Sequence, residues 1–315
     1  MRGGESIARR RLVAVVAAAL CLIGSATVAG ADSGPPVGAP ALAAMALSVD
    51  DLRPGASVQH QGYTKQPDFT LYYRREFKPG ASLGRSRLLV LDSEVGLEDT
   101  AAAATTAAAS VETVLRTRKG RLALARAALE DAGLSLTGLR LGSTGVRTLR
   151  AGDDAFALPL TVLLPRHVRL GIVLELVRVD RVIQLLYLVG QVDTKVVGSE
   201  AARLVGVAAD HMVGALVPAQ VVPPVVPGAP RVGLPSTADP GSWTNAPSSF
   251  AVQWLRCDSV GANCATIDGA TGPTYVPGAA DAGSTLEVSV VAANAVGSSQ
   301  PSLSAPSAAV LATSA

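Results

Sequence analysis

The chain has 315 residues, enough for about two domains once an export segment and a linker are set aside. Aromatic residues make up only 3% and charged residues 17% of the chain, so small apolar side chains supply most of its 49% hydrophobic content. Residues 32–217 hold 21 Lys and Arg against 19 Asp and Glu, and residues 218–315 hold 2 against 5. This balance excludes the basic field that nucleic-acid binding requires.

The N-terminus carries the features of an export signal. The basic residues Arg9 to Arg11 precede an apolar run, Leu12 to Ile23, and a small-residue sequence that ends at Ala31. This order predicts a secretory signal peptide over residues 1–31, cleaved after Ala31. The same stretch is long enough to stay as an uncleaved membrane anchor, and the paired arginines leave twin-arginine export open.

Strand and helix patterns follow a Gly-, Pro- and Ala-rich segment at residues 32–40. Alternating residues bounded by turn chemistry predict strands, and an apolar stripe at helical spacing predicts helices. The expected elements are a short helix over Ala41 to Leu52, strands over Ser57 to Tyr63, Phe69 to Phe77 and Ser86 to Asp92, a helix capped by Asp99 or Thr100 and ending near Arg118, and a helix over Arg121 to Ala132. Gly120 is expected to separate the two helices.

The longest apolar stretch predicts the centre of this domain. It reads as three successive strands, Phe156 to Leu164, Val168 to Val179 and Val182 to Val192, with apolar residues on both faces of the middle strand. A sheet buried on both faces needs helices on both faces, and a closing helix capped by Ser199 is expected to supply one of them. The separation of strands from helices along the chain favours an α+β domain with an antiparallel sheet over residues 41–217.

Three short sequences give this domain a family resemblance. They are Gln61-Gly-Tyr63, Tyr72-Tyr-Arg-Arg-Glu-Phe77 and Val177-Arg-Val-Asp-Arg-Val182. Together with the element order they resemble the PsbP/Mog1-like fold of exported actinobacterial proteins, including LpqN-type lipoproteins. The resemblance implies a binding or accessory module and brings no catalytic motif.

A change in composition separates a second domain. Pro218 to Pro230 contains five prolines and is expected to be a semi-rigid polyproline II linker. Over residues 231–312, short alternating runs around Trp254 and Val288 are spaced by turn residues, which predicts an all-β sandwich. Trp254 is expected to fill the core, with Leu286, Val288 and Val290 pointing inward with it.

This second domain has a more specific resemblance. The residues that carry it are Gly241-Ser-Trp243, Gln253-Trp-Leu-Arg-Cys257, Cys264, Tyr275, Asp281-Ala-Gly283 and Asn294-x-x-Gly297. The set resembles the bacterial Ig-like repeat of actinobacterial surface proteins, which implies an Ig-like sandwich after the α+β domain.

Cysteine use agrees with export. Once the signal is removed, Cys257 and Cys264 form an even pair in an oxidising compartment, so a disulfide is expected between them. The bridge would staple a local hairpin, unlike the inter-sheet bridge of antibody domains. Two cysteines without a nearby histidine cannot make a closed zinc site, which needs four ligands, so no metal ligand or cofactor is predicted.

Other candidate residues have ordinary structural interpretations beside functional ones. The three histidines, His60, His167 and His211, have no metal-binding spacing, and the pairs Asp50 with Asp51 and Asp153 with Asp154 are typical of loops and caps. The basic residues Arg116, Arg118, Lys119 and Arg121 can contact an anionic polymer or simply lie at a solvated helix junction. The residues Tyr63, Tyr72 and Tyr73 either line a groove or belong to the core.

These observations predict an exported protein of the cell envelope or the extracellular medium with a non-enzymatic binding or structural role. No catalytic residue, cofactor or nucleic-acid partner is expected. The expected partner is a protein or cell-wall component, with membrane contact only through an uncleaved N-terminal segment. The alternative is an envelope small-molecule receptor or enzyme whose site lies in the α+β domain, which predicts converging polar groups there.

Overall fold

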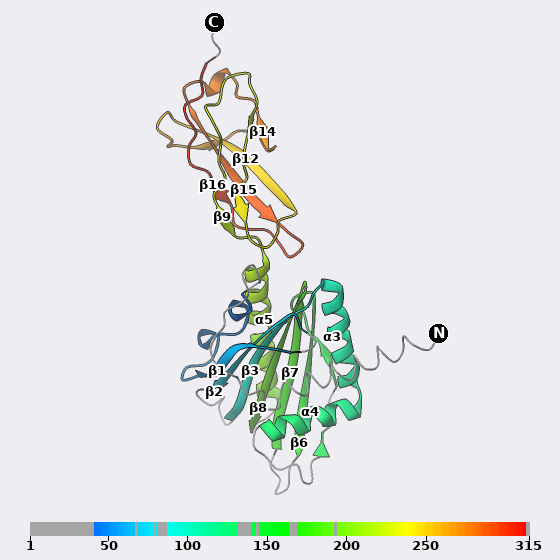
Figure 1. Cartoon of the computed structure of the whole chain (residues 1–315). Helices are drawn as coiled ribbons and strands as arrows, with labels where there is room; N and C mark the ends of the chain where they lie inside the picture. Colours follow the sequence, from blue (N-terminus) through cyan, green and yellow to red (C-terminus); the bar gives the residue numbers. More distant parts are fainter. Residues whose placement is uncertain are drawn as a thin grey trace, which may run out of the picture. The chain divides into compact units, whose positions relative to one another are not determined.

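The computed structural model describes residues 41–66, 69–78, 80, 87–131, 140–142, 145–163, 169–191 and 194–312. The chain forms two compact units that divide between Ala215 and Leu216. The first unit combines a sheet with helices and the second is built from strands, as Figure 1 shows. Their folds confirm the expected α+β domain followed by a β-sandwich.

The first unit is organised around one antiparallel sheet. Its strand order is β1-β2-β3-β8-β7-β6-β4, and β5 pairs with β6. The strands are β1 (Ser57–Thr64), β2 (Leu71–Lys78), β3 (Arg87–Leu97), β4 (Arg140–Leu141), β5 (Arg147–Thr148), β6 (Asp154–Leu163), β7 (Arg169–Val179) and β8 (Val182–Gln191). β6, β7 and β8 confirm the three predicted central strands within two residues at each end. The prediction succeeded because long apolar runs favour strands in a buried sheet.

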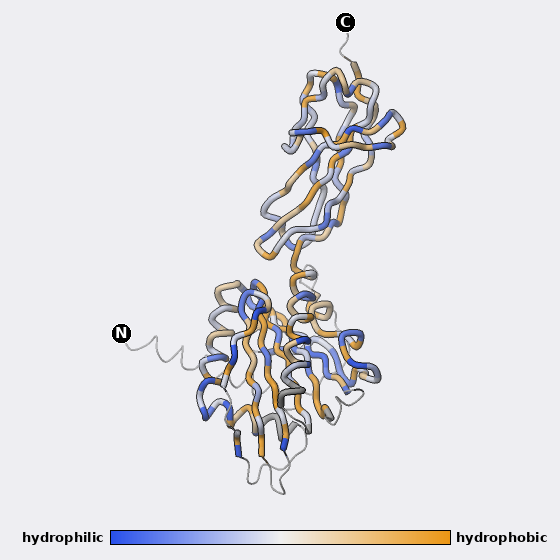
Figure 2. The backbone as a smooth tube through the Cα atoms, turned by 180° about the vertical axis from the view of Figure 1, so that it is seen from behind, coloured by the Kyte–Doolittle hydropathy of each residue, from blue (hydrophilic) through white to orange (hydrophobic). Residues whose placement is uncertain are grey.

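Helices α3 (Ala101–Arg116) and α4 (Arg118–Asp131) cover one face of this sheet, which we call the α3 face. Helix α3 packs on β6, β7 and β8, and α4 packs on β6. The core between them is aliphatic, and Figure 2 colours the central strands mainly as hydrophobic. Thr100 caps α3 by accepting a hydrogen bond from the Ala103 N–H at 3.1 Å, one of the two caps that the sequence predicts.

The junction between α3 and α4 differs from the expected break at Gly120. The chain bends at Thr117, whose hydroxyl donates to the Val114 carbonyl at 2.7 Å and accepts from the Gly120 N–H at 3.0 Å. Gly120 lies in the first turn of α4, where a Cβ atom would stand 2.2 Å from the Val114 carbonyl oxygen. Glycine is therefore required here for close approach of the two helices, and threonine supplies the turn.

The opposite face, which we call the α5 face, is covered by α5 (Thr194–Leu216) and the segment that holds α2 (Leu42–Met45) and the short helix η1 (Val49–Asp51). The Leu47 N–H donates to the Ser93 hydroxyl of β3 at 3.0 Å, and Arg203 of α5 donates to the Asp51 carbonyl at 2.7 Å. The predicted apolar stripe of α5 is confirmed as buried: Ala201, Leu204, Val205, Ala208 and Met212.

Two predictions on this face need correction. Helix α5 begins at Thr194, so Ser199 lies inside it and does not cap it. The expected helix over Ala41 to Leu52 is interrupted between α2 and η1, where Leu47 turns its N–H toward the sheet. Within the residues that the structure describes, no helix has the length and apolar character needed to cross a membrane.

The second unit is a β-sandwich around one tryptophan. A sheet of order β13-β12-β15-β16 is accompanied by two short antiparallel pairs, β10 with β14 and β9 with β11. The strands are β9 (Gln220–Val222), β10 (Ser236–Thr237), β11 (Ser242–Trp243), β12 (Ser249–Cys257), β13 (Ala265–Thr266), β14 (Thr274–Tyr275), β15 (Thr285–Ala293) and β16 (Ser302–Leu303). Trp254, Leu286, Val288 and Val290 are each fully buried, as predicted, and the Trp254 indole donates to the Gly272 carbonyl at 2.9 Å.

The Pro-rich stretch from Pro218 to Pro230 was expected to be a semi-rigid polyproline II linker between the domains, but it belongs to the second unit. Its residues form β9, and Val225 pairs with Asp239 through two backbone hydrogen bonds of 2.9 Å. Val226 is 5% exposed and packs in the Trp254 core. The valines between the prolines explain the difference, since they supply both β-forming backbone and apolar side chains for the sandwich.

Candidate functional site

A group of buried polar side chains lies on the α3 face, on the strands beside those that α3 and α4 cover. We call it the Arg74 cluster. Its members are Tyr72 and Arg74 of β2, Asp92 and Glu94 of β3, and Tyr187 of β8. Strand register brings them together, because Arg74 pairs with Glu94 and Asp92 pairs with Tyr187 across neighbouring strands.

Arg74 holds the centre of the cluster. Its Nη2 lies 2.5 Å from Asp92 Oδ2 and its Nε lies 3.4 Å from Glu94 Oε1. Burial alone would lower the pKa of Arg74, but Asp92 and then Glu94 outweigh it and raise this pKa. The guanidinium therefore stays charged between two carboxyl groups in a nearly dry environment.

Tyr72 has a buried hydroxyl group that makes no hydrogen bond of regular geometry among the described residues, and the Glu94 carboxylate is its hydrogen-bonding neighbour. The Tyr72 side chain is 2% exposed. Burial, followed by the nearby Glu94 carboxylate, raises the pKa of Tyr72 well above its ordinary value, so the hydroxyl stays protonated. A buried hydroxyl that is hydrogen-bonded this poorly costs free energy, which makes it a position where a bound polar group would add a hydrogen bond.

The cluster leads from the core toward the surface along the sheet. The Arg74 side chain is 11% exposed, compared with 3% for Asp92 and 5% for Glu94. Glu76 and the exposed His60 continue on the same face, since Asp92 pairs with Glu76 and Glu76 with His60. A ligand that approaches from the β1 edge would therefore meet His60, Glu76 and Asp92 one after another.

An aromatic pair borders the cluster. The rings of Phe69 and Tyr72 lie 5.5 Å apart between centroids. Phe69 can lie flat over β3 because the residue beneath it is Gly96, where a Cβ atom would stand 2.4 Å from the Phe69 ring. The cluster thus combines apolar ring surface with hydrogen-bonding groups.

The three candidate tyrosines do not line one groove. Tyr72 faces α3, whereas Tyr63 and Tyr73 pair across β1 and β2 on the α5 face, with ring centroids 5.0 Å apart. The Tyr73 hydroxyl donates to Gln61 at 3.0 Å and accepts from Arg75 at 2.9 Å. Only Tyr72 therefore belongs to the candidate site.

The candidate histidines show no catalytic arrangement where the structure describes them. His60 is exposed on β1, and His167 lies outside the described residues. His211 of α5 lies with Nε2 3.5 Å from Asp51 Oδ1, while Asp51 Oδ2 accepts from the Ser48 hydroxyl at 2.9 Å. The carboxylate stands between hydroxyl and imidazole, whereas a nucleophilic triad needs the imidazole in the middle.

The other charged candidates have structural partners. Asp153 and Asp154 both bind Arg178, at 3.0 and 2.8 Å, and Asp153 also accepts from the Asp180 N–H at 2.7 Å. In the basic group, Arg116 pairs with Glu112 at 2.6 Å. Arg121 donates to the Leu115 and Arg116 carbonyls, which satisfies the last turn of α3. These contacts account for the acidic pair and for Arg116 and Arg121 without a ligand.

Glu175 is a buried acid on the α5 face that the sequence analysis did not single out. It lies in β7 between Ala157 of β6 and Leu186 of β8, is 1% exposed, and its Oε2 has no hydrogen-bond partner in the described part of the chain. Burial raises the pKa of Glu175 to about 8, so the carboxyl group is protonated at neutral pH.

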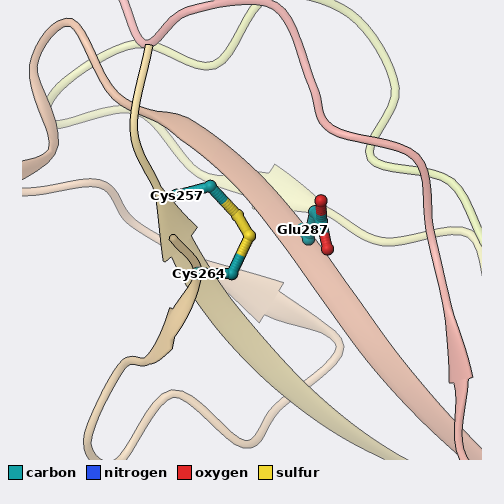
Figure 3. Close-up of side chains that lie close together, drawn as sticks. All are labelled: Cys257, Cys264 and Glu287. Carbon is teal, nitrogen blue, oxygen red and sulfur yellow. A yellow bond between two sulfur atoms is a disulfide. The ribbon is translucent and has the colours of Figure 1, made fainter. Parts of the chain in front are cut away.

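The two cysteines form the predicted disulfide, Cys257 to Cys264. Figure 3 shows Glu287 of β15 beside the bridge. One carboxylate oxygen of Glu287 and the two sulfur atoms all lie within 4.8 Å of one another, the one such group of potential metal ligands among the described residues. Sequence spacing could not reveal Glu287, because only the register that pairs it with Leu255 places it on the face of Cys257.

Comparisons with known proteins add little to this description. No protein-family model matches the chain, and no curated protein matches it significantly. Among solved structures, the chain is similar to the extracellular domain of PknH from Mycobacterium tuberculosis, with 10% identity and a TM-score of 0.33 over 53% of this chain and 94% of that one. We therefore argue function from the chain's own contacts.

Proposed function

We propose that this protein is exported and acts outside the cytoplasm as a non-enzymatic binding protein. In this proposal the α+β unit binds the ligand at the Arg74 cluster, and the β-sandwich is an Ig-like structural module. The observation that carries the proposal is the Tyr72 hydroxyl, a buried polar group that a ligand would satisfy.

Export is supported by the N-terminal sequence and by the disulfide. A basic region, the apolar run Leu12 to Ile23 and the small residues up to Ala31 follow the order of a signal peptide. The bridge between Cys257 and Cys264 fits an oxidising compartment. A cleaved signal would release the protein, and an uncleaved one would hold it at the membrane.

The chemistry of the cluster favours a ligand rich in hydroxyl groups. Tyr72 and Arg74 offer hydrogen-bond donors, and Asp92 and Glu94 offer acceptors, so a group that both donates and accepts matches the set. The neighbouring ring of Phe69 supplies apolar surface. A saccharide of the cell wall has this combination, and it agrees with the expected cell-wall partner.

A non-enzymatic role is supported by how the reactive side chains are used. Among the described residues, Asp51, Asp153 and Asp154 hold turns and caps, and His211 contacts the Asp51 carboxylate. Arg74 neutralises part of the charge of Asp92 and Glu94, which leaves neither as a poised base.

The proposal is tested by thermal unfolding of the purified chain with a panel of cell-wall saccharide fragments. A fragment present at 100 times its Kd stabilises the fold by about 2.7 kcal/mol, which gives a readable shift. We expect Tyr72→Phe to reduce this shift and Tyr73→Phe, which removes a hydroxyl from the opposite face, to keep it. Equal shifts in both variants would place the ligand elsewhere.

Cell fractionation tests the location independently. We expect the protein in the culture medium or the envelope fraction, with Ala31 or a nearby small residue at the cleavage point if the signal is removed. Recovery in the cytoplasm would contradict the proposal. A saccharide that is chemically changed during incubation would instead favour the alternative, an envelope enzyme with its site in the α+β unit.

A further inference from the structure

The three potential metal ligands at the disulfide, Cys257, Cys264 and Glu287, are positioned by strand pairing as well as by the bridge. Cys257 ends β12 and Cys264 precedes β13, and the two strands pair through Leu255 with Thr266 and Arg256 with Ala265. This pairing is a backbone interaction that does not depend on the sulfur atoms. We therefore expect the two cysteines to stay adjacent when the bridge is open.

The turn between the cysteines has its own set of hydrogen bonds. Asp258 Oδ1 accepts from the Val260 and Ala262 N–H groups at 3.0 and 2.8 Å, and Oδ2 accepts from the Asn263 amide at 2.8 Å. The Asp258 N–H also donates to the Ala262 carbonyl at 2.8 Å. These hydrogen bonds hold the turn in addition to the disulfide.

Glu287 supplies a third ligand from a neighbouring strand. It pairs with Leu255, so its side chain lies on the same face of the sheet as Cys257, as Figure 3 shows. Glu287 is 8% exposed and Cys257 is 2% exposed, whereas Cys264 is exposed. Two ligands are therefore anchored in the sheet, and the third is at the surface, where an incoming ion can reach it.

The chemistry of the three groups favours a thiophilic divalent cation. The two sulfur atoms and one Glu287 oxygen lie within 4.8 Å of one another in the bridged chain. After reduction a divalent cation can replace the two thiol protons and neutralise the negative charges of the thiolates and the carboxylate. Zn²⁺ binds thiolate and carboxylate ligands, and three protein ligands leave its fourth position for water. In the oxidised protein the sulfur atoms are bonded to each other and are not thiolates, so the ion has no site.

We propose that Cys257, Cys264 and Glu287 form a redox-gated binding site for a thiophilic divalent cation such as Zn²⁺. A thiol reductant opens the site: two reductant thiols are oxidised to a disulfide while the protein bridge gains two electrons and two protons. The cation then binds both sulfur atoms and the Glu287 carboxylate, and the two thiol protons are released. This proposal is independent of the Arg74 cluster, which lies in the other unit.

The test compares the oxidised and reduced full-length chain, with Cys21→Ser so that the pair holds the only thiols. The bridge is reduced with a phosphine, which takes up one oxygen atom from water and leaves two thiols, and the phosphine is removed without air. Cd²⁺ is then added, and thiolate-to-metal charge-transfer absorbance and proton release are measured. We expect one Cd²⁺ and two released protons per reduced chain, and neither signal in the oxidised chain.

Glu287→Gln separates a three-ligand site from simple binding by two thiols. We expect this variant, after reduction, to bind Cd²⁺ more weakly than the reduced chain with Glu287, by at least the roughly 10-fold that loss of a hydrogen-bonding partner behind a ligand already costs. Equal affinity would overturn the site as proposed. The near-ultraviolet circular dichroism of Trp254 monitors the fold, and its loss on reduction would also overturn the proposal, because the hairpin would then fail to hold its ligands together.

Discussion

Glu175 in the first unit and Asp281 in the second are both 1% exposed, yet their surroundings differ. Glu175 lies between apolar residues, and its Oε2 finds no hydrogen-bond partner in the described structure. Asp281 accepts hydrogen bonds from the Arg256 guanidinium and, at 2.7 Å each, from the Tyr275 hydroxyl and the Gly278 N–H. The two acids are therefore equally buried, but Asp281 accepts several hydrogen bonds and the Glu175 Oε2 atom accepts none in the described structure.

The comparison shows that partners, more than burial, decide the charge of a buried acid. For Glu175, burial raises the pKa to about 8. For Asp281, burial alone would raise the pKa, but the hydrogen bond from Tyr275, followed by those from Gly278 and Arg256, lowers it. At neutral pH the first unit therefore contains a protonated acid, Glu175, and the second unit contains an ionised one, Asp281.

The largest effect is expected for Asp281→Ala. Removing this carboxylate leaves Arg256 and Tyr275 without their partner and removes the support of the corner before β15. Losing a hydrogen bond to a charged group costs about 1.5 to 3 kcal/mol. The Arg256 side chain is 38% exposed and is not left as a buried charge, so the free energy of unfolding of the second unit should fall by about 3 kcal/mol. Urea denaturation followed by Trp254 fluorescence measures it. A loss below about 1 kcal/mol would show that Asp281 is exposed in solution.

Glu175→Gln should act in the opposite direction. The amide resembles the protonated acid and never ionises, whereas wild-type Glu175 has to hold a proton at pH 7 against an unfolded pKa near 4.5. We expect the first unit to gain about 2 to 3 kcal/mol at pH 7. Denaturant unfolding of both proteins measures the difference. Glu112→Gln on the outer side of α3 is the control and should change stability by less than about 0.5 kcal/mol.

The pH dependence of the wild-type chain sharpens the comparison. Between about pH 4.5 and 8 the folded first unit keeps a proton on Glu175 that the unfolded chain loses. The free energy of unfolding of this unit therefore falls by up to about 1.4 kcal/mol for each unit by which the pH rises. Asp281 has a lowered pKa, so its contribution is present above pH 3.8 and is lost as the pH falls further. Unfolding curves of the two units should thus move in opposite directions with pH.

The smallest effects are expected for two neighbouring tyrosines. Tyr73→Phe removes hydrogen bonds to Gln61 and Arg75 and should cost about 1 kcal/mol. Tyr72→Phe removes a hydroxyl that has no regular hydrogen bond and only the Glu94 carboxylate as its hydrogen-bonding neighbour, so in the absence of ligand the stability should change by less than about 1 kcal/mol. The midpoint of urea unfolding distinguishes them. A similar loss in both would mean that Tyr72 makes a regular hydrogen bond in the free protein.

Several elements were predictable because their signal is local. The apolar runs of β6, β7 and β8, the buried stripe of α5 and the alternation around Trp254 each follow a period of two or 3.6 residues that holds in any buried setting. Element boundaries were less predictable. Thr117 ends α3 and Gly120 lies inside α4, because side-chain and backbone hydrogen bonds, rather than residue propensity, decide where the chain bends.

The candidate sites depended on register, which sequence does not display. Arg74 meets Asp92 and Glu94 only because β2 pairs with β3 in one alignment, and a shift by one residue would place them on opposite faces. Tyr72 and Tyr73 looked alike in the sequence, but the pleat of the strand sends them to different faces. The same holds for Glu287, which reaches the disulfide across β12 and β15.

The sequence by itself determined the two-unit organisation, the α+β and β-sandwich classes and the disulfide partners, because each depends on composition or short-range spacing. Only the tertiary structure decided that the Pro-rich stretch joins the sandwich, that the Tyr72 hydroxyl is buried beside the Glu94 carboxylate, and that Glu175 and Asp281 hold opposite charge states. These properties depend on which distant groups surround a residue, and that is settled only when the sheets and helices pack.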